Sequence, residues 1–204
     1  MNEPPGSKVI AFPGDKIQIV LLPKVLGKGM YGSVHHCYQR GNPNLVYAVK
    51  VIERKKLKGK SHEYLMNEIT IMQEMRAVNV VSLISATKTQ SNYYLVMEYC
   101  NGGDLEGFIR ARGGYLTEPE AKVILRQIVN GLKEIKEQKV MHRDLKLANI
   151  LVNFPNLTKE EQESPGFNLK EYIKRISFVP SKNGEQPTEI VIKIADLGFA
   201  RKLN

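Results

Sequence analysis

The sequence contains no tryptophan and only two cysteines in 204 residues. Cys37 and Cys100 each lie beside strand-like sequence, so we expect no disulfide framework and a reducing setting, cytoplasmic or nuclear. No stretch approaches the roughly 20 unbroken apolar residues that a membrane span needs. Residues 1–7 lack the basic-then-apolar layout of a secretory signal. These absences favour a soluble globular protein, and an apolar content of 42% is sufficient for a buried core.

Positive charge exceeds negative charge, with 30 lysines and arginines against 21 aspartates and glutamates and a formal net charge of +9. Such an excess is typical of proteins that bind nucleic acids or anionic membranes. The basic residues are scattered, however, apart from one cluster at residues 54–60, RKKLKGK, between a strand-like and a helix-like segment. Charge runs of this kind are usually solvated connectors. Because paired Cys/His spacings and aromatic stacking motifs are absent, we expect no nucleic-acid partner.

The first half of the chain has the pattern of a small sheet with one helix. Runs rich in Val, Ile and Leu predict strands, and the polar or glycine-rich stretches between them predict turns. One segment instead places Leu65, Ile69 and Met72 at helical spacing. We expect strands over residues 17–25, 33–38, 45–52, 80–87 and 93–99, and a helix over residues 61–76.

The second half is mainly helical. Thr117 opens the sequence TEPE, a capping-box pattern with a proline in the first helical turn. Residues 153–189 are polar, contain four prolines and predict a long insertion with a short helix over 169–176, followed by a strand over 190–194. The predicted buried stripe of the long helix comprises Val123, Ile124, Gln127, Ile128, Leu132 and Ile135.

This order of elements predicts an α+β protein with two lobes. We assign residues 1–16 to an N-terminal tail and residues 17–100 to a small lobe with a five-stranded antiparallel sheet and one helix. Residues 101–204 form a mainly helical lobe that carries the insertion 153–189. A crevice between two such lobes is a favoured place for a small ligand.

Residues 27–34, GKGMYGSV, have glycines at the G-x-G-x-x-G spacing. Such a turn lets backbone N–H groups approach phosphate oxygens without Cβ clashes. A plain hairpin turn has the same composition. Dinucleotide-binding folds use this spacing between a strand and a helix, whereas the loop here lies between two predicted strands. The context therefore favours a phosphate-binding hairpin over a dinucleotide fingerprint.

Lys50 lies at the end of the apolar strand sequence YAVK. An edge-strand lysine that points to solvent would give this pattern. The alternative is a cation over nucleotide phosphates, held by a carboxylate of the following helix. Glu68 is the matching carboxylate, beside the apolar face at Ile69 and Met72. Because an inward Lys–Glu pair is costly to bury, this second interpretation implies a charged ligand nearby.

Residues 142–149, HRDLKLAN, follow the long helix and are flanked by apolar residues on both sides. Within this segment Asp144 can take a hydroxyl proton, Lys146 can steady a transferring phosphoryl group, and Asn149 can ligate a divalent ion. A surface loop can hold as many polar groups, but the apolar flanks indicate that this one is anchored. Asp196, which opens the triplet Asp-Leu-Gly after the last predicted strand, is a natural magnesium ligand.

The four motifs occur in the order of the protein-kinase signature set: the glycine loop, the strand lysine, the catalytic loop and the Asp-Leu-Gly triplet. The chain resembles the protein-kinase superfamily over residues 17–204. Residues 94–105, YLVMEYCNGGDL, and 195–203, ADLGFARKL, together with the insertion, are similar to the autophagy-initiating serine/threonine kinases. The resemblance implies a eukaryotic-type serine/threonine kinase domain with a protein-kinase-like two-lobed fold. It also implies ATP and Mg²⁺ as ligands, a protein hydroxyl as acceptor, and a C-terminal truncation at residue 204.

The resemblance assigns roles by position. Lys50 with Glu68 would hold the phosphates, and Asp196 with Asn149 would hold magnesium. Asp144 would be the catalytic base, and a lysine two residues after it, here Lys146, is typical of serine/threonine kinases. Adenine would lie between Leu26, Val34, Ala48, Leu151 and Ala195, beside the gatekeeper Met97. The Glu98 carbonyl and the Cys100 amide would bond the base, and Asp104 would reach the ribose. A hydrophobic spine would comprise Met72, Leu83, His142 and Leu197. The implied nucleotide-binding set is Leu26, Gly27, Lys28, Gly29, Met30, Tyr31, Gly32, Ser33, Val34, Ala48, Lys50, Met97, Glu98, Cys100, Asp104, Leu151 and Asp196.

The chain departs from the family pattern in places. Leu197 replaces the usual phenylalanine, and Leu147-Ala148 replaces the common Pro-Glu. Neither change removes a catalytic group, which disfavours a pseudokinase. The missing C-terminal parts of the large lobe keep open a catalytically incompetent fragment that acts as a nucleotide- or partner-binding module. A small-molecule kinase is disfavoured by the sequence of the hinge and the catalytic loop.

Overall fold

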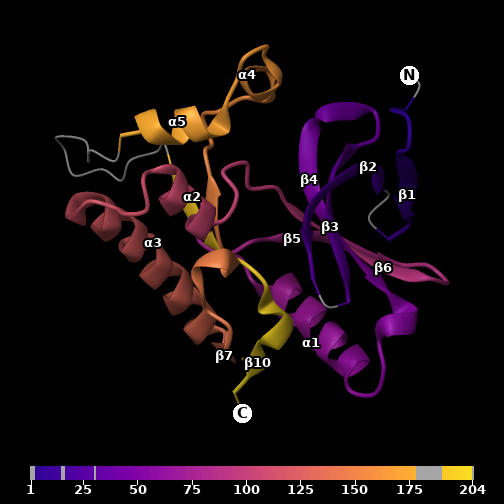
Figure 1. Cartoon of the computed structure of the whole chain (residues 1–204). Coiled ribbons are helices and arrows are strands. Elements are labelled where there is room, and N and C mark those ends of the chain that lie inside the picture. Colours follow the sequence, from indigo (N-terminus) through magenta and orange to yellow (C-terminus); the bar gives the residue numbers. More distant parts are fainter. Residues whose placement is uncertain (1–2, 15–16, 30, 178–189, 204) are drawn as a thin grey trace. The chain divides into compact units, whose positions relative to one another are not determined.

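A computed structural model describes residues 3–14, 17–29, 31–177 and 190–203. The chain forms two compact units (Figure 1). The first comprises Met1–Glu74 and Ser82–Tyr99, and the second comprises Met75–Val81 and Cys100–Asn204. In the described ranges, no helix combines the length and the apolar character that a bilayer crossing requires.

The first unit is a six-stranded antiparallel sheet with one α-helix. The helix α1 (Ser61–Glu74) follows a short 3-10 turn, η1 (Arg54–Lys56), and packs on β5. The strand order is β1-β2-β3-β4-β6-β5. The strands are β1 (Lys8–Phe12), β2 (Ile17–Lys28), β3 (Gly32–Gln39), β4 (Asn42–Glu53), β5 (Leu83–Lys88) and β6 (Asn92–Glu98).

The sheet has one strand more than the sequence predicted. The additional strand, β1, lies within residues 1–16, so the assignment of that segment to a tail was wrong for residues 8–12. It pairs with β2 along its whole length and also contacts β5. Ile10 and Phe12 alternate with exposed residues and enter the core, because successive strand side chains point to opposite faces. That core comprises Ile10, Phe12, Ile19, Cys37, Val49, Tyr94 and Val96.

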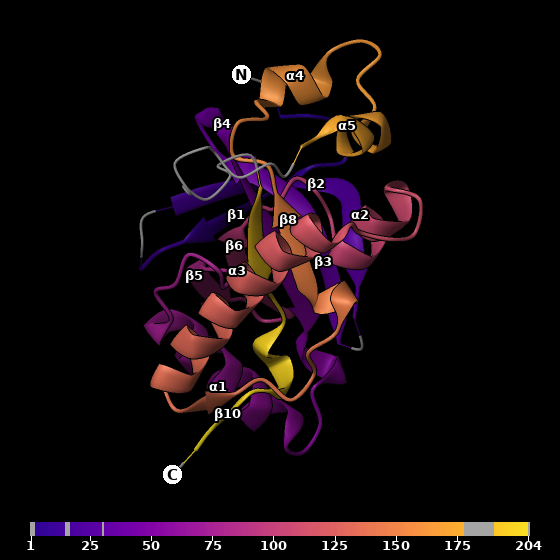
Figure 2. The ribbon, with the colours of Figure 1, turned by 90° about the vertical axis from the view of Figure 1, so that its left-hand side faces the viewer.

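The second unit is built around the long helix α3 (Glu118–Glu137), which packs against β9, while the short helix α2 (Leu105–Ala111) packs against β8 (Figure 2). The Thr117 backbone N–H donates to Glu120 Oε2 at 2.9 Å, as the capping sequence predicted. Two short antiparallel pairs, β8–β9 and β7–β10, complete the unit. The strands are β7 (Val140–Met141), β8 (Ile150–Asn153), β9 (Val191–Ile194) and β10 (Arg201–Lys202), and the 3-10 turns are η2 (Leu147–Asn149) and η3 (Leu197–Phe199).

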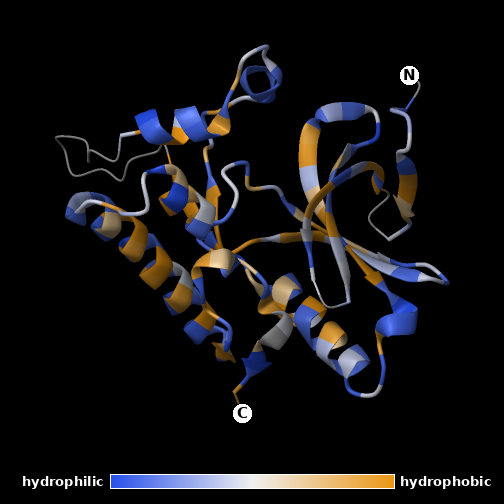
Figure 3. Ribbon diagram, in the orientation of Figure 1, coloured by the Kyte–Doolittle hydropathy of each residue, from blue (hydrophilic) through white to orange (hydrophobic). Residues whose placement is uncertain are grey.

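The predicted apolar stripe of α3 is confirmed almost completely. Five of its six members are buried, and Leu132 is partly buried. Figure 3 shows apolar residues recurring along this helix. Gly131 takes a further buried position on the same face. An added Cβ there would lie 2.6 Å from the Asn79 carbonyl oxygen, so the helix approaches the segment 75–81 at a residue without a side chain.

The insertion contributes to the core of the second unit. The short helix expected at 169–176 is present as α5 (Leu169–Arg175), and a further helix, α4 (Lys159–Glu163), was not predicted. Ile173 and Ile176 are buried, although the surrounding sequence is polar. Arg112 Nη1 donates to the carbonyl oxygens of these two residues at 2.8 and 3.1 Å, which ties the end of α5 to the end of α2. The last part of the insertion, residues 178–189, lies outside the described residues.

Candidate active site

The glycine-rich segment is a hairpin between β2 and β3, as its position between two predicted strands indicated. The Gly29 N–H donates to the Gly32 carbonyl oxygen at 2.9 Å. Met30, which the resemblance placed in the nucleotide site, lies outside the described residues. An added Cβ at Gly27 or Gly29 would meet nothing within 4 Å, whereas one at Gly32 would lie 1.8 Å from the Val51 carbonyl oxygen. Gly32 is therefore required by packing, and the other two glycines leave the loop open.

Lys50 and Glu68 form the ion pair that the spacing suggested. Lys50 Nζ on β4 lies 2.6 Å from Glu68 Oε1 on α1. The Lys50 side chain is 25% exposed and the Glu68 side chain 7%, so the lysine does not point away into solvent as an edge-strand residue would. Burying the Glu68 carboxylate costs free energy unless a cation accompanies it. The pair fixes the ammonium group on one face of the sheet.

Three of the residues assigned to adenine lie on that same face. The strand register pairs Val34 with Lys50 and Ala48 with Met97. Directly paired residues of antiparallel strands share a face, and Ala48 and Lys50 are two residues apart on one strand. The sheet therefore presents a small apolar surface beside the Lys50 ammonium group. Leu26 lies further along β2 and is 38% exposed.

Glu98 has a contact that the sequence did not reveal. Its Oε1 accepts the Ser82 N–H at 2.7 Å, and its own backbone N–H donates to the Ser82 carbonyl oxygen at 3.1 Å. The glutamate thus fastens the end of β6 to the residue that precedes β5. The resemblance considered only the carbonyl group of this residue, because nothing in the local sequence indicates a partner 16 positions away.

Asp104 and Leu151 belong to the second unit and form an isolated antiparallel bridge. Asp104 is the N-cap of α2, where its Oδ1 accepts the Gly107 N–H at 2.8 Å. Cys100 is the first residue of the second segment of this unit and is buried. Each of these residues was assigned to the nucleotide by resemblance, and the structure adds the structural role of the Asp104 carboxylate as a helix cap.

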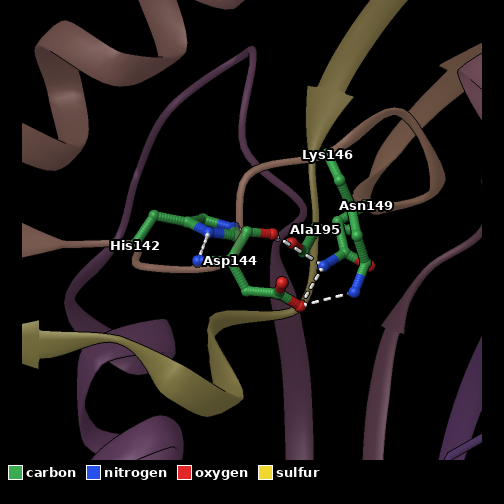
Figure 4. A network of polar contacts seen from close by, with 5 residues as sticks. All are labelled: His142, Asp144, Lys146, Asn149 and Ala195. Carbon is green, nitrogen blue, oxygen red and sulfur yellow. Dashed lines mark hydrogen bonds and ion pairs between the residues drawn. The ribbon is translucent and has the colours of Figure 1, made fainter.

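The catalytic loop brings its three polar residues together (Figure 4). Lys146 Nζ lies 2.8 Å from Asp144 Oδ2, and Asn149 Nδ2 donates to the same oxygen at 2.9 Å. Asn149 Nδ2 also donates to the Asp144 backbone oxygen at 2.9 Å. The 3-10 turn η2 places Asn149 where its amide reaches back to the aspartate. The loop is therefore a closed network around one carboxylate.

His142 connects this loop to the residue before Asp196. Its Nε2 donates to the Ala195 carbonyl oxygen at 3.0 Å, and its Nδ1 accepts the Asp144 N–H at 3.3 Å (Figure 4). These two contacts require the neutral tautomer with the proton on Nε2. The Ala195 N–H donates to the Asn149 carbonyl oxygen at 2.8 Å. The sequence assigned His142 only to a hydrophobic spine, so its hydrogen-bonding role was missed.

Two residues of this region adopt a left-handed backbone conformation that non-glycine residues rarely adopt. Asp196 has φ 61° and ψ 72°, and Arg143 has φ 68°. Such conformations cost on the order of 1–3 kcal/mol and persist only when the surrounding structure holds them. The contacts of His142 and Asn149 to Ala195 supply that support beside Asp196.

Electrostatics keep Asp144 ionised. Lys146 is the main cause that lowers the pKa of the Asp144 carboxyl, and the Asn149 hydrogen bond acts in the same direction. The pKa of Lys146 is raised, chiefly by Asp144 and with a further contribution from Asp196. A carboxylate held in this state accepts hydrogen bonds over a wide pH range.

The oxygen donors of the loop fit magnesium. Because both N–H bonds of the Asn149 amide are directed to Asp144, its Oδ1 faces away from that carboxylate and retains its lone pairs. Asp196 follows the strand end that is tied to Asn149. Among the described residues no group of three or more His, Cys, Asp or Glu side chains forms a metal cluster. Magnesium, however, commonly binds one or two protein oxygens together with water and substrate phosphates.

Comparison with known proteins also indicates a kinase. The family model described as "Protein kinase domain" matches residues 22–204. The chain is 33% identical over 183 residues to serine/threonine-protein kinase unc-51 of Caenorhabditis elegans, an alignment that covers 88% of this chain and 18% of that protein. It is 33% identical over 179 residues to serine/threonine-protein kinase ULK1 of Homo sapiens, an alignment that covers 88% of this chain and 14% of that protein. It is 36% identical over 153 residues to serine/threonine-protein kinase ULK3 of Mus musculus, with 75% of this chain and 32% of that protein covered.

These alignments confirm the resemblance, including its subfamily, and the α+β fold class that it implies. The chain spans less than a third of the length of each of these three relatives. The chain belongs to the protein kinase domain family, with serine/threonine-protein kinases of the unc-51 and ULK type among its relatives.

Proposed function

We propose that this chain transfers the γ-phosphoryl group of ATP to a serine or threonine hydroxyl of a protein. The observation that carries the proposal is the network in which Asp144 Oδ2 accepts hydrogen bonds from Lys146 and Asn149 at 2.8 and 2.9 Å. The network brings a carboxylate, an ammonium group and a side-chain amide together within one short loop. Phosphoryl transfer needs little more than positioning and charge stabilisation, which these groups supply.

The proposed transfer forms one bond to phosphorus, breaks one bond to phosphorus and moves one proton. The acceptor oxygen bonds to the γ-phosphorus, and the bond from that phosphorus to the β–γ bridging oxygen breaks, so that ADP leaves. Asp144 accepts a hydrogen bond from the attacking hydroxyl and takes its proton. Lys146, at 2.8 Å from the same carboxylate, offsets negative charge on the transferring phosphoryl oxygens.

Each unit would supply residues that hold the nucleotide. In the first unit, Lys50 with Glu68 would bind the phosphates, and Val34, Ala48 and Met97 would contact the base. In the second unit, Asn149 and Asp196 would hold Mg²⁺. The bound ion would neutralise phosphate charge. The remaining contacts proposed from the family are those of Leu26, Gly27, Lys28, Gly29, Met30, Tyr31, Gly32, Ser33, Glu98, Cys100, Asp104 and Leu151.

The test is phosphate transfer from γ-labelled ATP to a library of serine- and threonine-containing peptides, with Mg²⁺, using the 204-residue chain. Asp144→Asn and Lys50→Met should each abolish transfer, and Asp144→Asn should keep the stabilisation by Mg²⁺·ATP in a thermal melt. Lys122→Met is the control, since Lys122 is 69% exposed and pairs only with Glu118 on the same helix in the described contacts. Stabilisation by Mg²⁺·ATP without transfer would refute the proposal and favour the binding module.

A further inference from the structure

Strand β9 leads directly into Asp196 and is held differently at its two edges. On one edge it pairs with β8 from Ile194 to Val191 in regular antiparallel register. On the other edge the segment 79–81 forms only one isolated parallel bridge, between Val80 and Ile194. The backbone groups of β9 before that bridge would be left without a strand partner, and a buried unpaired backbone group is costly.

A side-chain amide of α3 occupies this second edge. Gln127 Oε1 accepts the Ile192 N–H at 2.9 Å, and Gln127 Nε2 donates to the Ile190 carbonyl oxygen at 3.3 Å. The glutamine thus makes the pair of contacts that a neighbouring strand residue would make. It is only 8% exposed and lies in the otherwise apolar stripe of α3.

A second amide completes the edge. Asn79 Nδ2 donates to the Ile192 carbonyl oxygen at 2.7 Å and to Gln127 Oε1 at 3.2 Å. Its backbone oxygen accepts the Ile194 N–H at 2.9 Å. The Val81 N–H then donates to the Ile194 carbonyl oxygen at 2.9 Å. Support along this edge therefore runs from Ile190 to Ile194, two residues before the left-handed Asp196.

We propose that Gln127 is a positioning residue which, with Asn79, fixes β9 and so sets where the Asp196 carboxylate lies. The inference rests on the proposed function, because it treats Asp196 as a ligand of the magnesium ion used in phosphoryl transfer. Three hydrogen bonds of the two side-chain amides act on the backbone of Ile190 and Ile192, and this backbone leads through β9 to Asp196. Groups that orient metal ligands in this way commonly change metal affinity by 10- to 100-fold when they are removed.

The test compares Gln127→Met with Gln127→Glu. Methionine keeps the length of the side chain and removes every hydrogen bond to β9. Glutamate keeps the acceptor for the Ile192 N–H and for Asn79, and loses the weaker donation to Ile190. Asn130→Met makes the same change of amide to thioether on the exposed side of the same helix and serves as the control.

Two measurements are made below the melting transition of every variant. The first is the backbone amide spectrum of 15N-labelled protein without metal, read at Ile192 and Asp196. Gln127→Met should shift the Asp196 amide and speed its hydrogen exchange, Gln127→Glu should shift it less, and Asn130→Met should leave it unchanged. An unchanged Asp196 amide in Gln127→Met would overturn the inference, whether or not the chain transfers phosphate.

The second measurement is the Mg²⁺ concentration that gives half-maximal transfer at saturating ATP. Gln127→Met should raise it about tenfold, with Gln127→Glu intermediate. A lower melting temperature with wild-type Mg²⁺ dependence would show that the amide only stabilises the fold, and would also overturn the inference. Absence of transfer in the wild type refutes the proposed function instead, and the amide spectrum still decides whether Gln127 controls Asp196.

Discussion

Replacing Gly32 by alanine should destabilise the first unit, although the residue sits in a loop motif usually explained by phosphate binding. The added Cβ would lie 1.8 Å from the Val51 carbonyl oxygen, 2.8 Å from the Val51 carbonyl carbon and 3.0 Å from the Ile52 Cα. All three atoms belong to the backbone of β4, so no side-chain rotation relieves the clash. Either β3 or β4 must shift.

The magnitude follows from the type of clash. Overpacking in a well-packed region typically costs about 1–3 kcal/mol. For a chain of this length that corresponds to a fall in melting temperature of roughly 2–12 °C. Since Val51 directly follows Lys50, a shift of β4 should also disturb the ion pair with Glu68 and weaken nucleotide binding.

Gly29→Ala is the matched control, because an added Cβ there meets nothing within 4 Å. Its melting temperature should equal or slightly exceed that of the wild type, since alanine restricts the unfolded chain. Melts of both variants by circular dichroism, with and without Mg²⁺·ATP, separate stability from binding. Equal melting temperatures for Gly32→Ala and the wild type would refute the packing argument.

The remaining predictions concern the side chains of Lys146, Cys37 and Arg112. Lys146→Met should raise the pKa of Asp144 toward its ordinary value of 3.8, which carboxyl 13C NMR titration measures. The pKa of Asp144 is lowered from 3.8 and that of Lys146 is raised from 10.5, so their ion pair persists between these two pH values. The pair is lost at lower pH when Asp144 is protonated, and at higher pH when Lys146 loses its proton. Burial raises the pKa of the Cys37 thiol to about 12, so iodoacetamide at pH 8 should label it only after unfolding, as mass spectrometry would show. Arg112→Met should cost on the order of 3 kcal/mol, because it leaves the largely buried Glu120 without its cation, and a denaturant titration measures this loss.

Each of these three predictions has a clear contrary result. A pKa of Asp144 that does not change in Lys146→Met would show that the ion pair is not its main cause. Labelling of Cys37 in the folded protein at the rate of a free thiol would contradict its burial. For Arg112, the comparison is Lys122→Met, which breaks a surface pair and should cost less than about 1 kcal/mol. Equal losses for the two variants would show that burial of the Arg112 pair contributes nothing.

The parts of the site that were predictable from sequence are those set by local register. The glycine hairpin lies between consecutive strands, and the catalytic-loop contacts of Asp144 span two and five residues. Lys50 and Glu68 are 18 residues apart, yet only a short connection with the 3-10 turn η1 separates the strand and the helix that carry them. In such cases the spacing itself restricts which side chains can meet.

The contacts that were missed join residues far apart in the sequence. Asn79 reaches Ile192 across 113 positions, and Gln127 reaches the same residue across 65. Strand β1 was missed although its partner β2 is near in the sequence, because Ile10 and Phe12 become core residues only in the cluster that also contains Tyr94 and Val96. No local pattern identifies such partners. Gln127 was visible only as a polar residue at a predicted core position, and that conflict is itself a signal, since a buried amide needs partners.

The lowered pKa of Asp144 limits the role of this carboxylate in the proposed reaction. Lys146, the main cause of the lowering, makes Asp144 a weaker base than an isolated aspartate. Early removal of a proton from a serine hydroxyl by so weak a base would be strongly unfavourable. In a loose transition state the bond to the γ-phosphorus is only partly formed, and the hydroxyl becomes acidic as that bond grows. Asp144 would therefore act first by orienting the hydroxyl, and would accept the proton only late in the transfer.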